Sequence, residues 1–177
     1  MILALETSCD DTCAAVITRD GEIRANVVSS QGIHDRYGGV VPEIASRHHL
    51  ELVNAVVDDA LQRAGATLDD AELIAVTQGP GLVGALLIGV ATAKGLAASR
   101  RLPLAPVDHL QGHVAANFLQ PDPIEPPFVC LIAKDVRNRF TVKTVPQRLR
   151  RLGADPWRDY SRTKQDITAG MLRALGG

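Results

Sequence analysis

The fold is decided by the first stretch of the chain, residues 2–28, which read ILALETSCDDTCAAVITRDGEIRANVV. Ile2–Glu6 is a short apolar run that ends in a polar turn, and Cys13–Thr18 is a second run of residues that favour strands. The pair Asp20-Gly21 is typical of a hairpin turn, and beyond it apolar and polar residues alternate over 23–27, as in a half-buried strand. This stretch therefore predicts three consecutive strands in an antiparallel meander.

Helices and strands alternate in the chain that follows. Apolar residues recur at three- and four-residue steps from about Pro42 to Ala64, which predicts an amphipathic helix that Gly65 ends. We expect five further elements, in chain order a strand, a helix, a strand, a helix and a strand, at Leu73–Thr77, Leu82–Ser99, Leu104–Val107, Leu110–Leu119 and Phe128–Ile132. The order βββαβαβα plus one strand indicates an α/β fold with a mixed sheet, of the ribonuclease-H-like or actin-like kind. Such folds usually have two lobes; a second lobe would begin at Phe128, and its pattern does not continue.

Charge divides the chain near Ala133. Its 177 residues include 19 Lys and Arg and 20 Asp and Glu. Residues 1–133 hold eight basic and sixteen acidic side chains, a net charge of −8, whereas residues 134–177 hold eleven and four, a net charge of +7. We therefore predict a first lobe over 1–133 and a basic tail of unknown origin over 134–177. In the tail we find no strand pattern, and residues 149–152 and 167–175 are compatible with short amphipathic helices.

The composition argues against several classes of protein. No apolar run reaches the ~18–20 residues of a membrane span, because three glycines and Lys94 interrupt the longest candidate, residues 82–98. The N-terminus lacks the basic stretch and cleavage site of a signal peptide. Three cysteines without metal-knuckle spacing are typical of thiols in a reducing compartment, and 3% aromatic residues disfavour base-stacking platforms. We expect a cytoplasmic protein with no membrane partner.

His109 and His113 form the sharpest local motif, His-Leu-Gln-Gly-His. In a helix, the i,i+4 spacing puts both imidazoles on one face, within reach of one metal ion. Two histidines do not make a tight site, so at least one further ligand would have to come from elsewhere. The alternative is that His109 ends a strand and His113 caps or packs locally.

The polar turn Ser8–Thr12 is a second candidate site. Its amides and hydroxyls can hold phosphate, and Asp10 or Asp11 can hold a cation-bound water; the alternative is a solvated hairpin turn. Glu6, at the end of the preceding strand, points toward the same rim.

Two further features favour structural roles. Residues 78–84, QGPGLVG, resemble a phosphate loop but lack the Lys-Ser/Thr end of a Walker loop, so a tight turn with close packing is favoured. We expect Lys94, on an apolar helix, to be buried and to snorkel or pair with an acid, and His48, on the apolar stripe, to be a core histidine.

Four segments together resemble a known family. They occur in one order with matching gaps, at residues 6–12 (ETSCDDT), 37–47 (YGGVVPEIASR), 79–82 (GPGL) and 109–113 (HLQGH). Over about residues 1–133 the chain is similar to the universal tRNA threonylcarbamoyladenosine transferases, once described as O-sialoglycoprotein endopeptidases. The paralogous partner of that enzyme lacks the His-x-x-Gly-His segment, so the chain resembles the catalytic member.

The resemblance implies an actin-like ATPase-type fold of two lobes with one divalent metal, iron or zinc, in the cleft between them. It implies transfer of a threonylcarbamoyl group from threonylcarbamoyl-adenylate to the N6 amine of the adenosine beside the anticodon, in tRNAs that read A-starting codons. By position, His109 and His113 would be metal ligands, Asp10 and Asp11 catalytic residues near the phosphates and the metal, and Ser8 with Asp10 nucleotide-binding. A metal there would act as a Lewis acid on the carbamoyl carbonyl or the phosphate.

Partners are implied in the same way. They are tRNA, an ATPase subunit with ATP, and a paralogous actin-like subunit that docks on the helix at about residues 43–64, for which we name Val53 and Val57.

The resemblance ends where the charge changes. After the strand at Phe128–Ile132 the family has a Ser-Gly-Gly-His-Thr-type loop, whereas this chain reads Lys134-Asp135-Val136-Arg137, and the aspartate that completes the metal site has no counterpart. Two functions follow: the transferase, or a non-catalytic truncated lobe that docks the partner subunit, tRNA or both, with the tail adding phosphate contacts. A metallopeptidase is disfavoured, because no glutamate follows the first histidine as in His-Glu-x-x-His.

Overall fold

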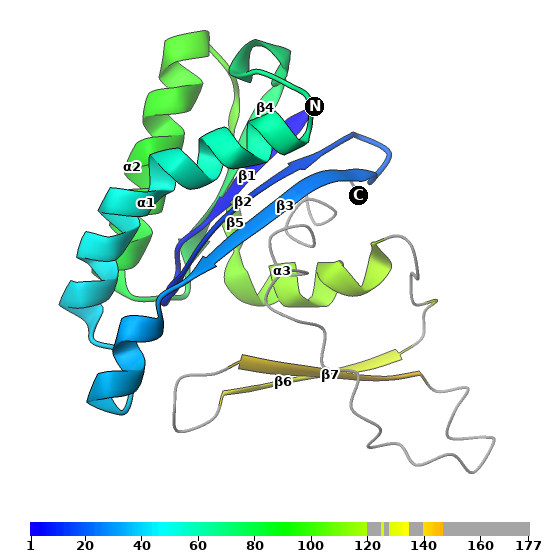
Figure 1. Cartoon of the computed structure of the whole chain (residues 1–177). Coiled ribbons are helices and arrows are strands. Elements are labelled where there is room, and N and C mark those ends of the chain that lie inside the picture. The colour runs from blue at the N-terminus through cyan, green and yellow to red at the C-terminus, as the bar shows by residue number, and fades with distance from the viewer. Residues whose placement is uncertain (120–124, 126–127, 135–139, 147–177) are drawn as a thin grey trace.

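The computed structural model describes residues 1–119, 125, 128–134 and 140–146. Its centre is a five-stranded mixed sheet with the strand order β3-β2-β1-β4-β5 (Figure 1). The strands are β1 (Ile2–Glu6), β2 (Asp11–Ile17), β3 (Ile23–Ser30), β4 (Leu73–Gly79) and β5 (Leu104–Asp108). β1, β2 and β3 pair antiparallel, whereas β1, β4 and β5 run parallel to one another. The predicted mixed sheet is confirmed.

The predicted meander is present, and its second strand is longer than expected. The β2–β3 hairpin closes where the backbone N–H of Thr18 donates to the carbonyl oxygen of Glu22 at 3.0 Å, and Gly21 takes a φ of 90°, which favours glycine. β2 begins at Asp11, two residues before the predicted start, because Asp11 pairs with Ser30 of β3.

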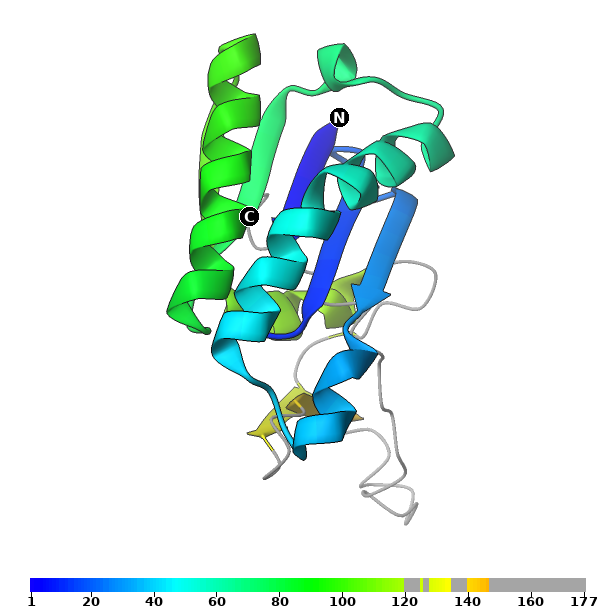
Figure 2. The same cartoon turned by 60° about the vertical axis from the view of Figure 1, so that its left-hand side comes forward.

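Two helices, α1 (Pro42–Arg63) and α2 (Val83–Arg100), cover one face of the sheet (Figure 2). α3 (His109–Ala115) follows β5 directly, and Leu119 beyond it packs on the opposite face against Ala4 and Val107. Three short 3-10 turns complete the chain up to residue 119: η1 (Gly32–Tyr37), η2 (Leu68–Asp70) and η3 (Ala116–Phe118).

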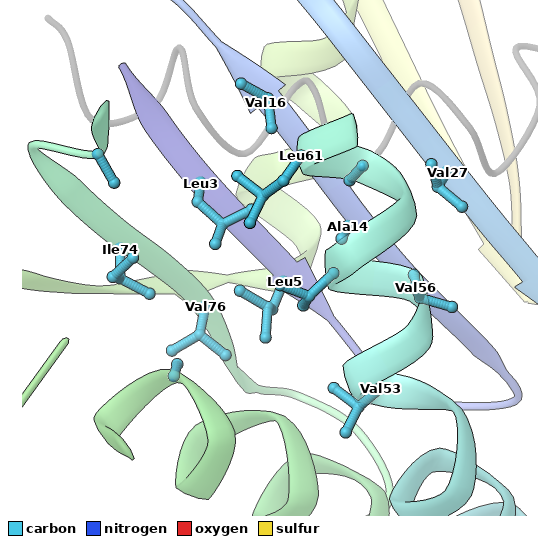
Figure 3. Close-up of a cluster of buried hydrophobic side chains, with 14 of the residues drawn as sticks. Leu3, Leu5, Ala14, Val16, Val27, Val53, Val56, Leu61, Ile74 and Val76 are labelled. Carbon is cyan, nitrogen blue, oxygen red and sulfur yellow. The ribbon is translucent and has the colours of Figure 1, made fainter. Parts of the chain in front are cut away.

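The main core lies between the sheet and these two helices. Leu3 and Leu5 of β1 are fully buried and face Leu61 and Val53 of α1, and Ile74 of β4, also fully buried, lies beside Val76 in the same cluster (Figure 3). Burying a side chain of this size stabilises the fold by about 1.5–3 kcal/mol. This layer holds the end of β1, and with it the candidate site, in a fixed position.

Val53 and Val57 belong to this core. They are 4% and 5% exposed, because the apolar stripe of α1 faces the sheet. These two side chains thus have almost no exposed surface, and their part in a partner interface stays a prediction.

Two further predictions on the helices need correction. The face of α1 toward the sheet runs through Ala45, His49 and Val53, so His49 is the core histidine, fully buried, and His48 is only half-buried. Lys94 is exposed, because α2 turns Gly89 and Ala93 inward instead.

Among the helices of the described residues, α2 alone has the length and apolar composition needed to cross a membrane. One such helix is weak evidence of a membrane span, because the core helix of a soluble protein can have the same length and composition.

A separate two-stranded sheet consists of β6 (Phe128–Lys134) and β7 (Phe140–Pro146), antiparallel to each other (Figure 1). β7 corrects the prediction that residues 134–177 contain no strand; its sequence, FTVKTVP, is rich in the β-branched and aromatic residues that favour strands. This hairpin spans residue 133, where the sequence predicts the boundary between the first lobe and the basic tail. The boundary itself stays a prediction. The proposed helices at 149–152 and 167–175 lie outside the described residues.

Candidate functional site

The two histidines of the motif lie at the junction of β5 and α3. Asp108 caps the helix, because its Oδ1 accepts the backbone N–H groups of Leu110 and Gln111 at 2.9 and 3.0 Å. His109 and His113 are 4% and 2% exposed, and their Nε2 atoms lie 3.2 Å apart. The prediction that the i,i+4 spacing brings both imidazoles together is confirmed.

The spacing of these two nitrogen atoms fits a shared metal ion. Two imidazole nitrogens bound to one tetrahedral ion at about 2.0–2.1 Å lie about 3.3–3.4 Å apart. The observed 3.2 Å is close to this value. Within the described part of the chain, no group of three or more His, Cys, Asp or Glu side chains is arranged to hold a metal. His109 and His113 therefore fit as two ligands, and a complete site needs further donors.

Glu6, at the end of β1, contacts the first histidine of this pair. Its Oε2 lies 3.1 Å from Nδ1 of His109 and accepts the hydroxyl of Thr77, while its Oε1 accepts the backbone N–H of Ser8. Burial alone would raise the pKa of this carboxyl, but the hydrogen bonds and the charge interaction with His109 outweigh it and lower the pKa to about 2. Glu6 is thus an ionised, buried carboxylate beside a candidate metal ligand.

His113 is neutral at ordinary pH. Burial lowers the pKa of this imidazole to about 4, with a further contribution from a positive charge on His109. A neutral imidazole can offer a nitrogen lone pair to a metal without first losing a proton.

The Ser8–Thr12 turn lies against the same site. Ser8 Oγ is 3.1 Å from Nδ1 of His109, and Ser8, Asp11 and Thr12 are all buried. The alternative of a solvated hairpin turn is therefore wrong. Asp10, on the same turn, is half-buried. Catalytic roles for Asp10 and Asp11, and nucleotide binding by Ser8 and Asp10, stay predictions.

His49 anchors this turn from α1. Its Nε2 lies 3.1 Å from the carbonyl oxygen of Cys9, and its Nδ1 lies 2.8 Å from Oγ1 of Thr12. Because a carbonyl can only accept, Nε2 carries the proton and Nδ1 accepts from the Thr12 hydroxyl. Burial also lowers the pKa of His49, which keeps it neutral.

Glycines bring α2 close to the end of β1. The N–H of Leu82 donates to the carbonyl of Ser8 at 2.8 Å, and a Cβ on Gly81 would come within 2.8 Å of Ser8 Cβ. Gly81 therefore allows the close packing that was predicted for this strand-to-helix turn, whereas a Cβ on Gly79 would meet no atom within 4 Å.

Sequence reasoning placed Glu6 at the rim of the candidate site without assigning it a role, and it missed Thr77 and His49. A signal for the first two was present, because Glu6 and Thr77 are polar residues at the ends of otherwise apolar strands. β1, β4 and β5 are parallel, so their carboxyl ends, where ligands commonly bind, meet at one edge of the sheet. His49 carried no such signal, since its neighbour His48 fits the same apolar spacing.

The chain is similar in sequence to known proteins. The family model described as tRNA N6-adenosine threonylcarbamoyltransferase matches residues 22–154, beyond the predicted boundary at residue 133. A protein of that name from Clostridium perfringens (strain SM101) is 57% identical over 133 residues, which are 75% of this chain and 39% of the relative. One from Clostridium botulinum (strain Hall) is 52% identical over 132 residues, 74% of this chain and 39% of the relative. The chain thus spans about two fifths of the length of these relatives.

A solved structure supports the fold. YeaZ from Pseudomonas aeruginosa superposes with a TM-score of 0.54 at 17% sequence identity, over 82% of this chain and 59% of that chain.

Proposed function

Because the chain belongs to the tRNA N6-adenosine threonylcarbamoyltransferase family, we propose that it carries the N-terminal, metal-binding part of a tRNA-modifying transferase. The reaction is transfer of a threonylcarbamoyl group from threonylcarbamoyl-adenylate to the N6 amine of the adenosine beside the anticodon, in tRNAs that read A-starting codons. In this proposal the five-stranded sheet and its helices are one lobe of an actin-like fold whose second lobe begins at β6. The protein acts in the cytoplasm with an ATPase subunit and ATP.

The observation that carries the proposal is the pair of buried Nε2 atoms 3.2 Å apart, backed by a carboxylate. A divalent iron or zinc ion on His109 and His113 would supply a Lewis acid that polarises the carbamoyl carbonyl or the phosphate of the substrate. Glu6 holds the ring of His109 in place, and burial keeps His113 neutral, so that both rings are available as ligands near pH 7.

The Ser8–Thr12 turn would hold the nucleotide part of the substrate. Its buried hydroxyls and backbone N–H groups can donate to phosphate oxygens, and Asp10 and Asp11 can hold water bound to a cation. His49 of α1 holds the turn through its hydrogen bond to the carbonyl oxygen of Cys9, and Gly81, just before α2, packs against Ser8 of the turn. The turn is therefore positioned before any ligand arrives, which lowers the cost of ordering it on binding.

Elemental analysis of the purified full chain tests the proposal. The parent is expected to hold close to one iron or zinc ion per chain, and a His109→Ala/His113→Ala variant none. His48→Ala, which removes a half-buried histidine from α1, is the matched control and should keep the metal. Equal metal in the parent and the double variant, or none in the parent, would overturn the metal site. In a complementation assay, the same double substitution in the full-length relative should abolish the modification.

A second function, docking of a paralogous actin-like subunit, is favoured by exposed apolar side chains on α1 and α2. Leu50, Val83 and Leu87 are 64%, 84% and 64% exposed, and the two helices lie side by side (Figure 2). Leu87→Asp should abolish co-purification with the paralogous subunit while leaving the unfolding midpoint of the free chain unchanged. Retention of the partner by that variant would exclude this face.

A further inference from the structure

Glu6 is surrounded by hydrogen-bond donors. The backbone N–H of Ser8 faces Oε1, and the hydroxyl of Thr77 faces Oε2. Oε2 also lies 3.1 Å from Nδ1 of His109, a residue 103 positions later in the chain. The Ser8 N–H cannot reverse its role, so Oε1 must always be an acceptor.

The same logic places a proton on His109. Both oxygens of Glu6 already act as acceptors, Oε1 for the N–H of Ser8 and Oε2 for the hydroxyl of Thr77, and two lone pairs facing each other at 3.1 Å in a buried site would repel. Nδ1 of His109 therefore carries the hydrogen and donates to Glu6. The hydroxyl of Ser8, 3.1 Å from the same nitrogen, can either donate or accept, so it does not decide between the two tautomers.

We propose that Glu6 is a positioning residue that fixes His109 as its Nδ1–H tautomer and so turns the bare Nε2 lone pair of His109 toward His113. Nε2 of His113 lies 3.2 Å from Nε2 of His109, so in the metal-free protein His113 carries its own hydrogen on Nε2 and donates it to that lone pair. A histidine that binds a metal through one nitrogen commonly donates its other N–H to a carboxylate, which fixes both ring orientation and tautomer. The consequence for metal binding rests on the proposed function, whereas the tautomer itself does not.

Glu6→Gln reverses one hydrogen bond without changing the size of the side chain. The Ser8 N–H keeps the amide oxygen on its own side, so the amide NH2 replaces Oε2. That NH2 can donate to the Thr77 hydroxyl, which is able to accept, and to Nδ1 of His109 only if this nitrogen has lost its hydrogen. We therefore expect the proton of His109 to move to Nε2, where it blocks the lone pair.

Nitrogen-15 NMR of the full chain, free of metal and near neutral pH, tests the inference. Two-bond proton–nitrogen correlations identify which ring nitrogen carries the hydrogen. We expect Nδ1–H for His109 in the parent and Nε2–H in Glu6→Gln. His49, which donates from Nε2 to the carbonyl of Cys9, is the internal reference and should show Nε2–H in both proteins. Thr77→Val removes another partner of the same carboxylate and should leave the His109 tautomer unchanged.

Zinc titration provides the second readout. Loss of such a carboxylate partner typically costs 10–100-fold in metal affinity, so Glu6→Gln should weaken zinc binding by about that factor and Thr77→Val by much less. A parent His109 with its hydrogen on Nε2, or a tautomer that Glu6→Gln leaves unchanged, overturns the inference. If the His109 tautomer differs between the parent and Glu6→Gln but the parent binds no zinc, the inference on Glu6 is supported and the metal site of the proposed function is contradicted. Where Glu6→Gln does not fold, the parent spectrum alone decides.

Discussion

Gly89 of α2 lies on Thr7, next to the candidate site, and Gly89→Ala tests how closely the helix packs there. A Cβ at this position would overlap Oγ1 of Thr7 and come within 3.4 Å of its Cβ and Cγ2. Thr7 is 1% exposed, and its hydroxyl donates to the carbonyl of Ala85 at 2.8 Å. The side chain therefore cannot turn away without losing that hydrogen bond.

The size of the effect follows from opposing contributions to the free energy of unfolding. Alanine is more favourable than glycine in a helix by about 1 kcal/mol. Against this gain, overpacking costs about 1–3 kcal/mol and the lost hydrogen bond of Thr7 about 1 kcal/mol. Gly89→Ala should therefore lower the free energy of unfolding by about 1–3 kcal/mol.

Gly95 on the same helix is the matched control. A Cβ there would meet no atom within 4 Å, so Gly95→Ala should raise the free energy of unfolding by about 0.5–1 kcal/mol. Urea unfolding followed by circular dichroism measures both variants. Thr7→Ala/Gly89→Ala should be more stable than the sum of its single changes predicts, because the overlap is removed. Equal stability of Gly89→Ala and Gly95→Ala would refute the close packing of α2 on the site.

Three further predictions concern stability. His49→Ala should lower the free energy of unfolding by about 2 kcal/mol or more, because it leaves the buried Thr12 hydroxyl without its acceptor. Urea unfolding measures this change, and a loss below about 0.5 kcal/mol would contradict the anchoring role of His49. Glu6 has a folded pKa of about 2, below its usual 4.5, so its contribution is fully present above pH 4.5 and is lost as the pH falls toward 2. Between pH 7 and pH 3 the free energy of unfolding should fall by about 2 kcal/mol more in the parent than in Glu6→Gln; equal losses would contradict it. Leu5→Ala, at a fully buried site, should lower the free energy of unfolding by about 2–5 kcal/mol, and Leu87→Ala, on the surface, by less than about 0.5 kcal/mol. Thermal or urea unfolding of both variants measures the difference, and equal losses would contradict the assigned core.

Local patterns in the sequence were sufficient for most of the elements. The hairpin turn at Asp20-Gly21, the helical spacing over 42–64 and the glycine that follows it each depend on residues close together in the chain. The pairing of His109 with His113 is of the same kind, because one helical turn separates them.

Properties that depend on distant parts of the chain were not predictable in this way. His48 and His49 both fit an apolar spacing, and only the position of the sheet selects His49. The same holds for Val53, which the sheet buries, and Leu50, which it leaves exposed. Glu6 meets His109 across 103 residues, and no local pattern in the sequence encodes that contact.

The place of β1 in the sheet has a consequence for the order of assembly during protein synthesis. β1 leaves the ribosome before the other strands of its sheet, and one of its partners, β2, follows it directly in the chain, but its other partner, β4, begins only at Leu73. Contacts between residues far apart in the chain form late, because closing a long loop costs entropy before the contact repays it. The hydrogen bond between Glu6 and His109 is therefore among the last to form. An intact hydrogen bond between Glu6 and His109 would thus mark a chain that has completed the folding of residues 1–109.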